Sequence, residues 1–181
     1  MSKPRLHIRH VNLARGFRGG ERQTLLLIEA LARIDDKQGG IEQSLVCRRD
    51  SPMRAALAGM DIELIDADHA LAGHAQRPRA SLTHAHEAKA VHWAWIERRL
   101  RGTPYILTRR VPQPVKDKRF NRWTYRGAAT AVAISSVIET HLRQRDWCPV
   151  ARIPSVLSGQ PSDPTEVAKL ALLDIGHQKM S

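Results

Sequence analysis

The chain has few of the features that define several common protein classes. Only two of its 181 residues are cysteines, Cys47 and Cys148, and they form no C-x-x-C pair. A disulfide scaffold or a zinc finger is therefore not indicated, and both residues are expected to be buried free thiols. No apolar run approaches the ~18–20 residues that span a bilayer. The amino-terminal residues also lack the apolar core of a signal peptide, so we expect a cytoplasmic protein.

The composition is that of a folded, basic chain. Apolar residues make up 42% of it, and 11 glycines and 10 prolines are too few for a disordered or fibrous protein. The length suits one domain that buries about 70% of the surface its unfolded chain would expose. Lys and Arg exceed Asp and Glu by 29 to 18, a net charge of +11. This excess is compatible with nucleic acid, an anionic membrane surface or an anionic small molecule as the partner.

Segments with strand and helix patterns alternate along the chain. Strands are predicted at residues 6–12, 42–47, 61–65, 81–84, 105–108, 130–134 and 151–153. Helices are predicted at residues 21–34, 87–101, 119–126, 136–145 and 163–173, with a short one after Ser51-Pro52. Ser51 is the expected cap of that short helix, and Ser136 to Glu139 has capping-box spacing. This order predicts an α/β fold, a single Rossmann-like domain with a doubly wound, mostly parallel sheet.

The loop after the first strand is rich in glycine and leads into a helix. In such sheets ligands bind outside the carboxyl ends of the strands, where the strand order reverses. Gly19 and Gly20 would let backbone N–H groups approach a phosphate at the helix N-terminus. The loop has neither the G-x-G-x-x-G nor the P-loop pattern, so a generic dinucleotide or ATP site is not supported. A tight turn that requires positive φ is an equally open interpretation.

His84-Ala85-His86-Glu87 follows the fourth predicted strand. Two histidines and a glutamate are suitable metal ligands, but the H-E-x-x-H spacing fails because position 90 is Ala, so we expect no metal. His84 and His86 should point to the same face of the strand. We favour a polar cluster at the ligand-binding crevice at the carboxyl ends of the strands, in which an imidazole or carboxylate binds or deprotonates a hydroxyl. The alternative for Glu87 is a favourable position at the helix N-terminus.

The positive charge is concentrated between Glu97 and Arg126. These thirty residues include ten Lys and Arg and only two acidic residues, so they carry +8 of the net charge. The segment includes the loop after the fifth predicted strand, with Arg109, Arg110 and Lys116, and arginines of this kind can hold a phosphate or carboxylate. A solvated face is the alternative. Three nearby tryptophans would also suit a nucleic-acid or membrane surface.

Taken in order, these motifs resemble the N-terminal domain of a family 4 (group 1) glycosyltransferase of the GT-B fold. The resemblance runs from about Leu6 to Gly159. The matching segments are Asn12-Leu13 through Gly19-Gly20-Glu21, Leu25 with Ala30-Leu31, Val46-Cys47 with Ser51-Pro52, His84-Ala85-His86-Glu87, Thr103-Pro104 with Thr108-Arg109-Arg110, Ala133-Ile134-Ser135 with Val137-Ile138, and Ile153-Pro154-Ser155 to Gly159. The motifs look most like those of transferases that build lipopolysaccharide core and related cell-surface polysaccharides in Gram-negative bacteria.

The resemblance implies an acceptor-side domain. It would hold a sugar or lipid-linked acceptor, while a second Rossmann-like domain holds the nucleotide-diphospho-sugar donor, and transfer would proceed with retention and without a metal. Gly19 and Gly20 would form the donor-phosphate loop. His86 and Glu87 would be the catalytic cluster that faces the cleft.

The resemblance also implies a set of acceptor- and anion-binding residues. Ser135 matches the polar residue that opens the helix after the sixth strand. Arg110 stands where several relatives carry a histidine. We therefore expect Arg110 to bind an anion, together with Arg109 and Lys116.

A donor domain is missing from this pattern. Residues 1–160 would be the glycosyltransferase domain and residues 161–181 a linker or helix that leads into a donor-binding domain, from the same gene or a separate chain. We therefore expect no cofactor in this chain and little or no transferase activity from it alone. The basic segment would fit a peripheral position on the inner face of the bacterial inner membrane.

Two other functions stay open. One is a non-catalytic basic module that binds nucleic acid or an anionic membrane surface, although nucleic acid would not explain the polar motifs at the strand ends. The other is a stand-alone α/β enzyme that uses His86 and Glu87 on a small substrate.

Overall fold

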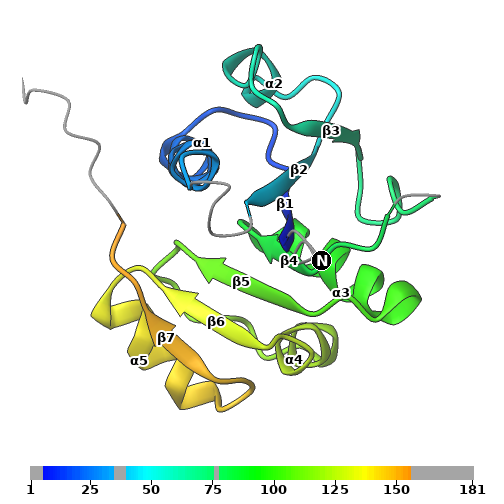
Figure 1. The fold of residues 1–181 in the computed structure, drawn as a ribbon. Coiled ribbons are helices and arrows are strands. Elements are labelled where there is room, and N and C mark those ends of the chain that lie inside the picture. The colour runs from blue at the N-terminus through cyan, green and yellow to red at the C-terminus, as the bar shows by residue number, and fades with distance from the viewer. Residues whose placement is uncertain (1–5, 35–39, 76–77, 156–181) are drawn as a thin grey trace, which may run out of the picture.

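The fold is a seven-stranded sheet, seen in the computed structural model, which describes residues 6–34, 40–75 and 78–155. Its strands are β1 (Leu6–Asn12), β2 (Ile41–Cys47), β3 (Glu63–Asp66), β4 (Leu82–Ala85), β5 (Tyr105–Arg109), β6 (Thr130–Ala133) and β7 (Val150–Arg152). They lie in the order β3-β2-β1-β4-β5-β6-β7 (Figure 1), and every pair is parallel. The predicted doubly wound α/β domain is thus confirmed.

The helices also lie close to their predicted positions. They are α1 (Gly19–Ala32), α2 (Met53–Ala56), α3 (Ala88–Arg101), α4 (Arg119–Arg126) and α5 (Ser136–Arg145). α3 ends at Gly102, which adopts φ +70°, a conformation that glycine reaches without steric cost. The helix predicted at 163–173 and the domain boundary between residues 160 and 161 lie outside the described residues.

Two predicted helix caps are each wrong by one residue. The cap of α5 is Ser135, not Ser136, because the extended backbone at Ser135 (φ −147°) lets its hydroxyl accept the Ile138 N–H at 3.4 Å. α2 is preceded by Pro52 rather than capped at Ser51, although the Ser51 hydroxyl still accepts the Met53 N–H at 3.4 Å.

The two faces of the sheet have separate cores. In β2, Val46 packs into the larger core, which contains side chains of α3, α4 and α5, whereas Leu45 and Cys47 pack against Leu25 and Ile28 of α1. This alternation is the two-residue period of a strand. α1 and α2 therefore cover one face and α3, α4 and α5 the other. On the α1 side, the described part of the chain supplies no helix other than α1 and α2.

The strand order reverses between β1 and β4. β1 leads into α1 on one face, β4 leads into α3 on the other, and His10 pairs with His84 in their parallel register. The loops after the two strands therefore separate and leave a crevice at the carboxyl end of the sheet. Within the described residues, no helix has the length and apolar character of a membrane span.

Candidate functional site

Several predicted site residues meet at this crevice. Gly19 and Gly20 open α1, His86 and Glu87 follow β4, and Arg110 follows β5. A Cβ built at Gly20 would lie 3.5 Å from the Arg110 Cδ, so the Arg110 side chain packs against the start of α1. The structure therefore brings the predicted phosphate loop beside one of the two predicted arginines.

The other predicted anion-binding residues lie apart from Arg110. Arg109 faces α4, where it hydrogen-bonds to Tyr125, and it also donates to the Gln113 carbonyl at 2.6 Å. Lys116 is exposed, and Ser135 is half-buried as the α5 cap. Neighbouring residues at a strand end point to opposite faces, which separates the arginine pair.

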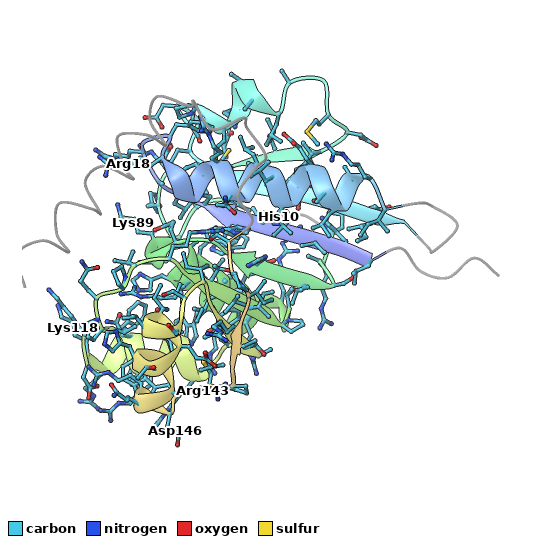
Figure 2. The ribbon with its side chains drawn as sticks, turned by 90° about the vertical axis from the view of Figure 1, so that its left-hand side faces the viewer. His10, Arg18, Lys89, Lys118, Arg143 and Asp146 are labelled. Atoms are coloured by element: carbon cyan, nitrogen blue, oxygen red, sulfur yellow. The ribbon has the colours of Figure 1, made fainter. Side chains whose placement is uncertain are left out.

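Three histidines form a cluster beneath α1, where Figure 2 labels His10. His10 and His86 are buried, and His10 Nδ1 lies 3.0 Å from His86 Nε2. The ring of His84 lies 4.0 Å from that of His86, and His84 Nε2 contacts the Thr108 hydroxyl at 2.8 Å. His10 is not among the predicted site residues, and the signal that could have identified it is the face that it shares with His84 in adjacent parallel strands.

Burial keeps these histidines uncharged. It lowers the pKa of His10 to about 4, although the hydrogen bond with Gln43 acts to raise that pKa. It lowers the pKa of His84 to about 3, helped by the nearby His10 and Arg110, and lowers the pKa of His86 well below its usual value. All three are therefore neutral imidazoles at pH 7, each with one N–H and one lone pair.

The hydrogen-bond network determines which nitrogen carries each proton. The Gln43 amide donates to the Ile28 carbonyl at 3.1 Å, so its oxygen faces His10 Nε2, 3.1 Å away, and accepts. A neutral His10 then has a lone pair on Nδ1, and His86 must donate to it from Nε2. His86 Nδ1 is consequently unprotonated, and this buried atom has no hydrogen-bond partner among the described residues.

Glu87 joins the two loops of the crevice. Its carboxylate accepts the N–H groups of Lys89 (2.7 Å) and Ala90 (2.8 Å) at the start of α3, and that of Leu13 (3.3 Å) after β1. Burial raises the pKa of Glu87, while these backbone hydrogen bonds lower it. The favourable position at the helix N-terminus is therefore present, and a catalytic role of Glu87 stays a prediction.

Arg110 is a half-buried cation without an acidic partner in contact. Burial lowers its pKa and the charge of Glu21 raises it, yet the guanidinium makes no ion pair or hydrogen bond within the described ranges, and its Nε is buried and unpartnered. An anion at this position would relieve that cost. The first turn of α1 adds N–H groups without intrahelical acceptors.

The glycines of this loop are not required by the backbone conformation. Neither Gly19 nor Gly20 has a positive φ, so the interpretation as a tight turn with positive φ is wrong. A Cβ at Gly19 would meet nothing within 4 Å. The fold itself therefore leaves open space beside the first turn of α1.

The histidine cluster is also the group of described residues that could hold a metal ion. His10, His84 and His86 each offer one ligand atom, and these atoms lie within 4.8 Å of one another. The third possible ligand is thus His10 and not Glu87, because the Glu87 oxygens accept hydrogen bonds from backbone N–H groups. The Arg110 cation nearby disfavours a second cation, and the absence of a bound metal stays a prediction.

Some of the positive charge lies on exposed cations and some on cations that bind other groups of the protein. Arg18, Lys89 and Lys118 lie along one edge of the molecule, the edge at which the strands end (Figure 2). Other cations of the basic segment bind groups of the protein: Arg101 donates to the His74 carbonyl at 2.6 Å, and Arg122 pairs with Asp117 at the surface at 2.9 Å. The cations between residues 97 and 126 therefore do not form one uniform solvated face.

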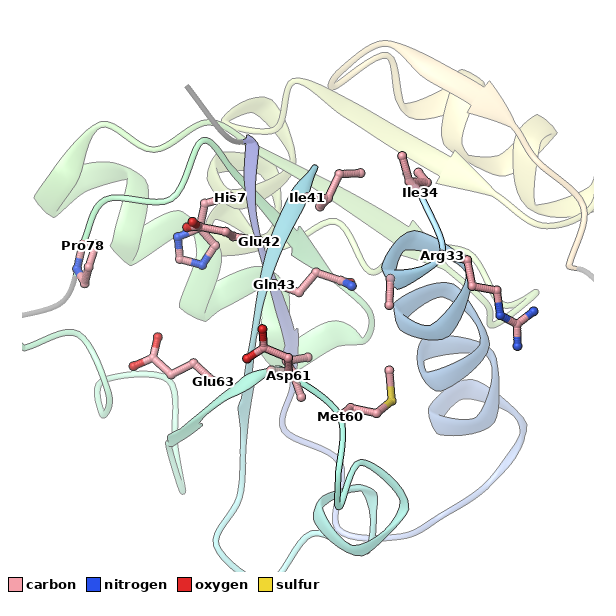
Figure 3. A pocket seen from close by; sticks show the side chains of 12 residues that line it. His7, Arg33, Ile34, Ile41, Glu42, Gln43, Met60, Asp61, Glu63 and Pro78 are labelled. Atoms are coloured by element: carbon pink, nitrogen blue, oxygen red, sulfur yellow. The ribbon is translucent and has the colours of Figure 1, made fainter. Parts of the chain in front are cut away.

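Two hollows flank α1. One, of about 400 Å³, runs between α1 and the strands β5 and β6. The other, of about 890 Å³, lies at the amino ends of the strands, where His7, Glu42 and Glu63 line it (Figure 3). Parallel sheets bind ligands at the opposite end, so we assign it no function.

Comparison with known proteins places the fold. No protein-family model and no curated protein matches the sequence. Among solved structures, HepE of Anabaena in complex with UDP and glucose matches with a TM-score of 0.61 and 12% identity, over 93% of this chain and 50% of that one. The lipopolysaccharide outer core galactosyltransferase WaaB matches with a TM-score of 0.61 and 16% identity, over 86% and 47%. A glycosyltransferase of Rickettsia africae matches with a TM-score of 0.61 and 15% identity, over 92% and 48%.

The chain spans about half the length of these structures. Its fold is that of the Rossmann-like half of a GT-B glycosyltransferase, and the GT-B part of the resemblance is thereby confirmed. Family 4 in particular stays a prediction.

Proposed function

We propose that this chain is the acceptor-side half of a retaining glycosyltransferase that uses a nucleotide-diphospho-sugar donor. The fold supports this proposal, since HepE is seen with UDP and glucose and WaaB is an outer core galactosyltransferase. The synthesis of cell-surface polysaccharide or lipopolysaccharide is the process that this likeness favours.

One observation carries the proposal. At the point where the strand order reverses, the Arg110 side chain packs against the first turn of α1 at Gly20, and its charge acts on the buried His86, whose Nδ1 has no partner among the described residues. Arg110 and the α1 amides suit an anionic phosphate. The lone pair of His86 suits a hydroxyl, from which it accepts a hydrogen bond.

The remaining parts follow from this arrangement. Glu87 positions the loop after β1 against α3, and with it the start of α1. A second domain, from the same gene or another chain, would bind the donor from the opposite side, so we expect the 181 residues alone to be inactive. The exposed cations at the strand-end edge would face an anionic membrane or a lipid-linked acceptor.

A transfer assay tests the proposal. The purified chain receives UDP-glucose or UDP-galactose and a lipopolysaccharide core acceptor, alone and fused at Ser155 to the second half of WaaB. We expect transfer only from the fusion, and a loss of about tenfold or more on His86→Gln, the value of one lost hydrogen bond to the acceptor hydroxyl. The exposed His69→Gln should leave the rate unchanged. Transfer by the isolated chain would contradict the half-enzyme proposal, and equal rates of the His86→Gln and parent fusions would contradict the role of His86.

A basic module that binds nucleic acid or an anionic membrane surface is the second candidate. The row of exposed cations that includes Arg18, Lys89 and Lys118 favours it. Such a module would bind duplex DNA or RNA with an affinity that falls steeply as salt rises. Binding to anionic vesicles without such binding to duplexes would contradict the nucleic-acid form of the module, and sugar transfer by the fusion would distinguish the transferase from a membrane-binding module.

A further inference from the structure

α1 has a second apolar stripe that the core does not use. Leu25 and Ile28 pack into the smaller core, whereas Leu26, Leu27 and Ala30 line the hollow of about 400 Å³ on the other side of the helix. The opposite wall is the face of β5 and β6 that carries no helix within the described residues. It consists of Ile106, Thr108, Val132 and Ile134, with Ile153 at the rim. This volume falls within the range of small-molecule sites, about 300–1,000 Å³.

The groove is lined mainly by apolar side chains, although Gln23, Arg33 and Ser155 also line it, and a group of polar side chains lies at one end. Arg110, His84 and Thr108 line it where β5 ends, next to the first turn of α1. The Nε of Arg110 is buried there without a partner. From Gly20 to Ala30 the helix rises about 15 Å, so an extended chain held at Arg110 would run along the apolar wall.

We propose that this groove binds the hydrocarbon chain of a lipid phosphate, with the phosphate at Arg110 and the first turn of α1. The inference rests on the proposed function in one respect, since it makes this lipid the carrier of the acceptor sugar. The binding itself requires only the groove and Arg110.

Charge complementarity selects this ligand over others. A neutral hydrocarbon would leave the Arg110 guanidinium unpaired in a desolvated site, which is costly. A free phosphate would leave Leu26, Leu27 and Ile106 exposed to water. A sugar needs hydrogen-bond partners along its whole length, which these side chains do not offer.

Calorimetry on the full 181-residue chain tests the inference with three probes below their micelle concentrations. Dodecyl phosphate has chain and phosphate, dodecyl maltoside has the chain, and inorganic phosphate has the anion. We expect dodecyl phosphate to bind most tightly. Arg110→Gln should weaken its binding about tenfold or more, the value of one charge-assisted hydrogen bond, and leave dodecyl maltoside unaffected. Arg126→Gln, at an exposed arginine of α4 on the other face of the sheet, should change neither.

A second pair of variants tests the apolar wall. Ala30→Phe would fill the groove from an exposed position on α1 and should weaken both alkyl probes, whereas Ala32→Phe, outside this groove on the same helix, should not. Thermal unfolding shows that each variant is folded.

Three results would overturn the inference. They are equal dodecyl phosphate binding by Arg110→Gln and the parent chain, equal binding by Ala30→Phe, and binding only after residues 156–181 are deleted. The last would mean that the chain's own carboxyl-terminal segment occupies the groove. Sugar transfer by the fusion without lipid binding would overturn this inference alone, and lipid binding without transfer would leave it standing while the proposed function fails.

Discussion

Arg9 and His10 are neighbours in β1, both buried, and they belong to two different polar networks. Arg9 points to the α3 face and donates to Glu97 at 2.9 Å, to the Pro78 carbonyl at 2.9 Å and to the Ser44 hydroxyl at 3.3 Å. His10 points to the α1 face into the neutral histidine cluster. The first network is charged, and its arginine binds three partners. The second is uncharged and ends at His86 Nδ1, which has no hydrogen-bond partner among the described residues.

This difference separates scaffold from site. Glu97, fully buried, also binds His74 at 2.8 Å, and Arg101 lies 3.6 Å away, so the network ties β1 and α3 to the segment that leads to β4. A buried network with every group partnered stabilises one structure. A buried acceptor without a partner, such as His86 Nδ1, is costly and calls for an explanation by function.

The largest expected effect comes from breaking the charged network. Arg9→Met leaves the Glu97 carboxylate buried without its closest arginine and should reduce the free energy of unfolding by about 3–5 kcal/mol. Urea denaturation measures it, with the exposed Arg119→Met as control. Adding Glu97→Leu should recover part of the loss, because no uncompensated charge then remains. A loss below about 1 kcal/mol in Arg9→Met would contradict the role of this network as scaffold.

Acidification should act on the neutral network instead. His10 and His84 have folded pKa values of about 4 and 3 against an unfolded value near 6.5, so the unfolded chain binds more protons as the pH falls. Their contribution is complete above pH 6.5 and declines below it, by about 0.7 kcal/mol per histidine between pH 7 and pH 6. His86, His7 and His92, whose pKa values burial also lowers, add in the same direction.

Urea denaturation at the two pH values measures this loss. His10→Gln should flatten the dependence, whereas the exposed His69→Gln should leave it intact. A stability that is constant from pH 7 to pH 6 would show that these imidazoles are not held neutral by the fold.

The smallest expected effect is on the end of the neutral network. Gln43→Leu removes the acceptor of the His10 Nε2 proton and should cost about 1–2 kcal/mol, against no change for the exposed Gln113→Leu. It also frees the tautomer of His86. Imidazole ¹⁵N shifts should show unprotonated Nδ1 in the parent chain and a mixture of tautomers in Gln43→Leu. A protonated Nδ1 of His86 in the parent chain would contradict the proposed hydrogen-bond direction.

Local patterns were sufficient to predict most of the fold. The three-residue spacing of Leu25, Ile28 and Leu31 predicts α1, and Gly102 predicts the end of α3, because such signals depend on nearby residues. The cap positions were wrong by one residue, since both Ser135 and Ser136 are plausible caps and only the backbone decides between them.

The site was less accessible to sequence reasoning. His10 and Gln43 join the cluster through pairings between strands far apart in the chain, which no local pattern specifies. The separation of Arg109 from Arg110 was within reach, because a strand that extends to Arg109 turns consecutive side chains to opposite faces. The prediction ended that strand at residue 108 and so kept the two together.

The pairing of β1 with β4 has a consequence for how the chain folds. Ile8 pairs with Leu82 in this register, so more than 70 residues separate the partners, whereas β1–β2 and β5–β6 join much nearer segments. Closing so long a loop loses chain entropy before any strand contact compensates for it. We therefore expect β1–β3 and β4–β7 to condense as two units whose docking limits the folding rate, and the ligand crevice to form only in that last step.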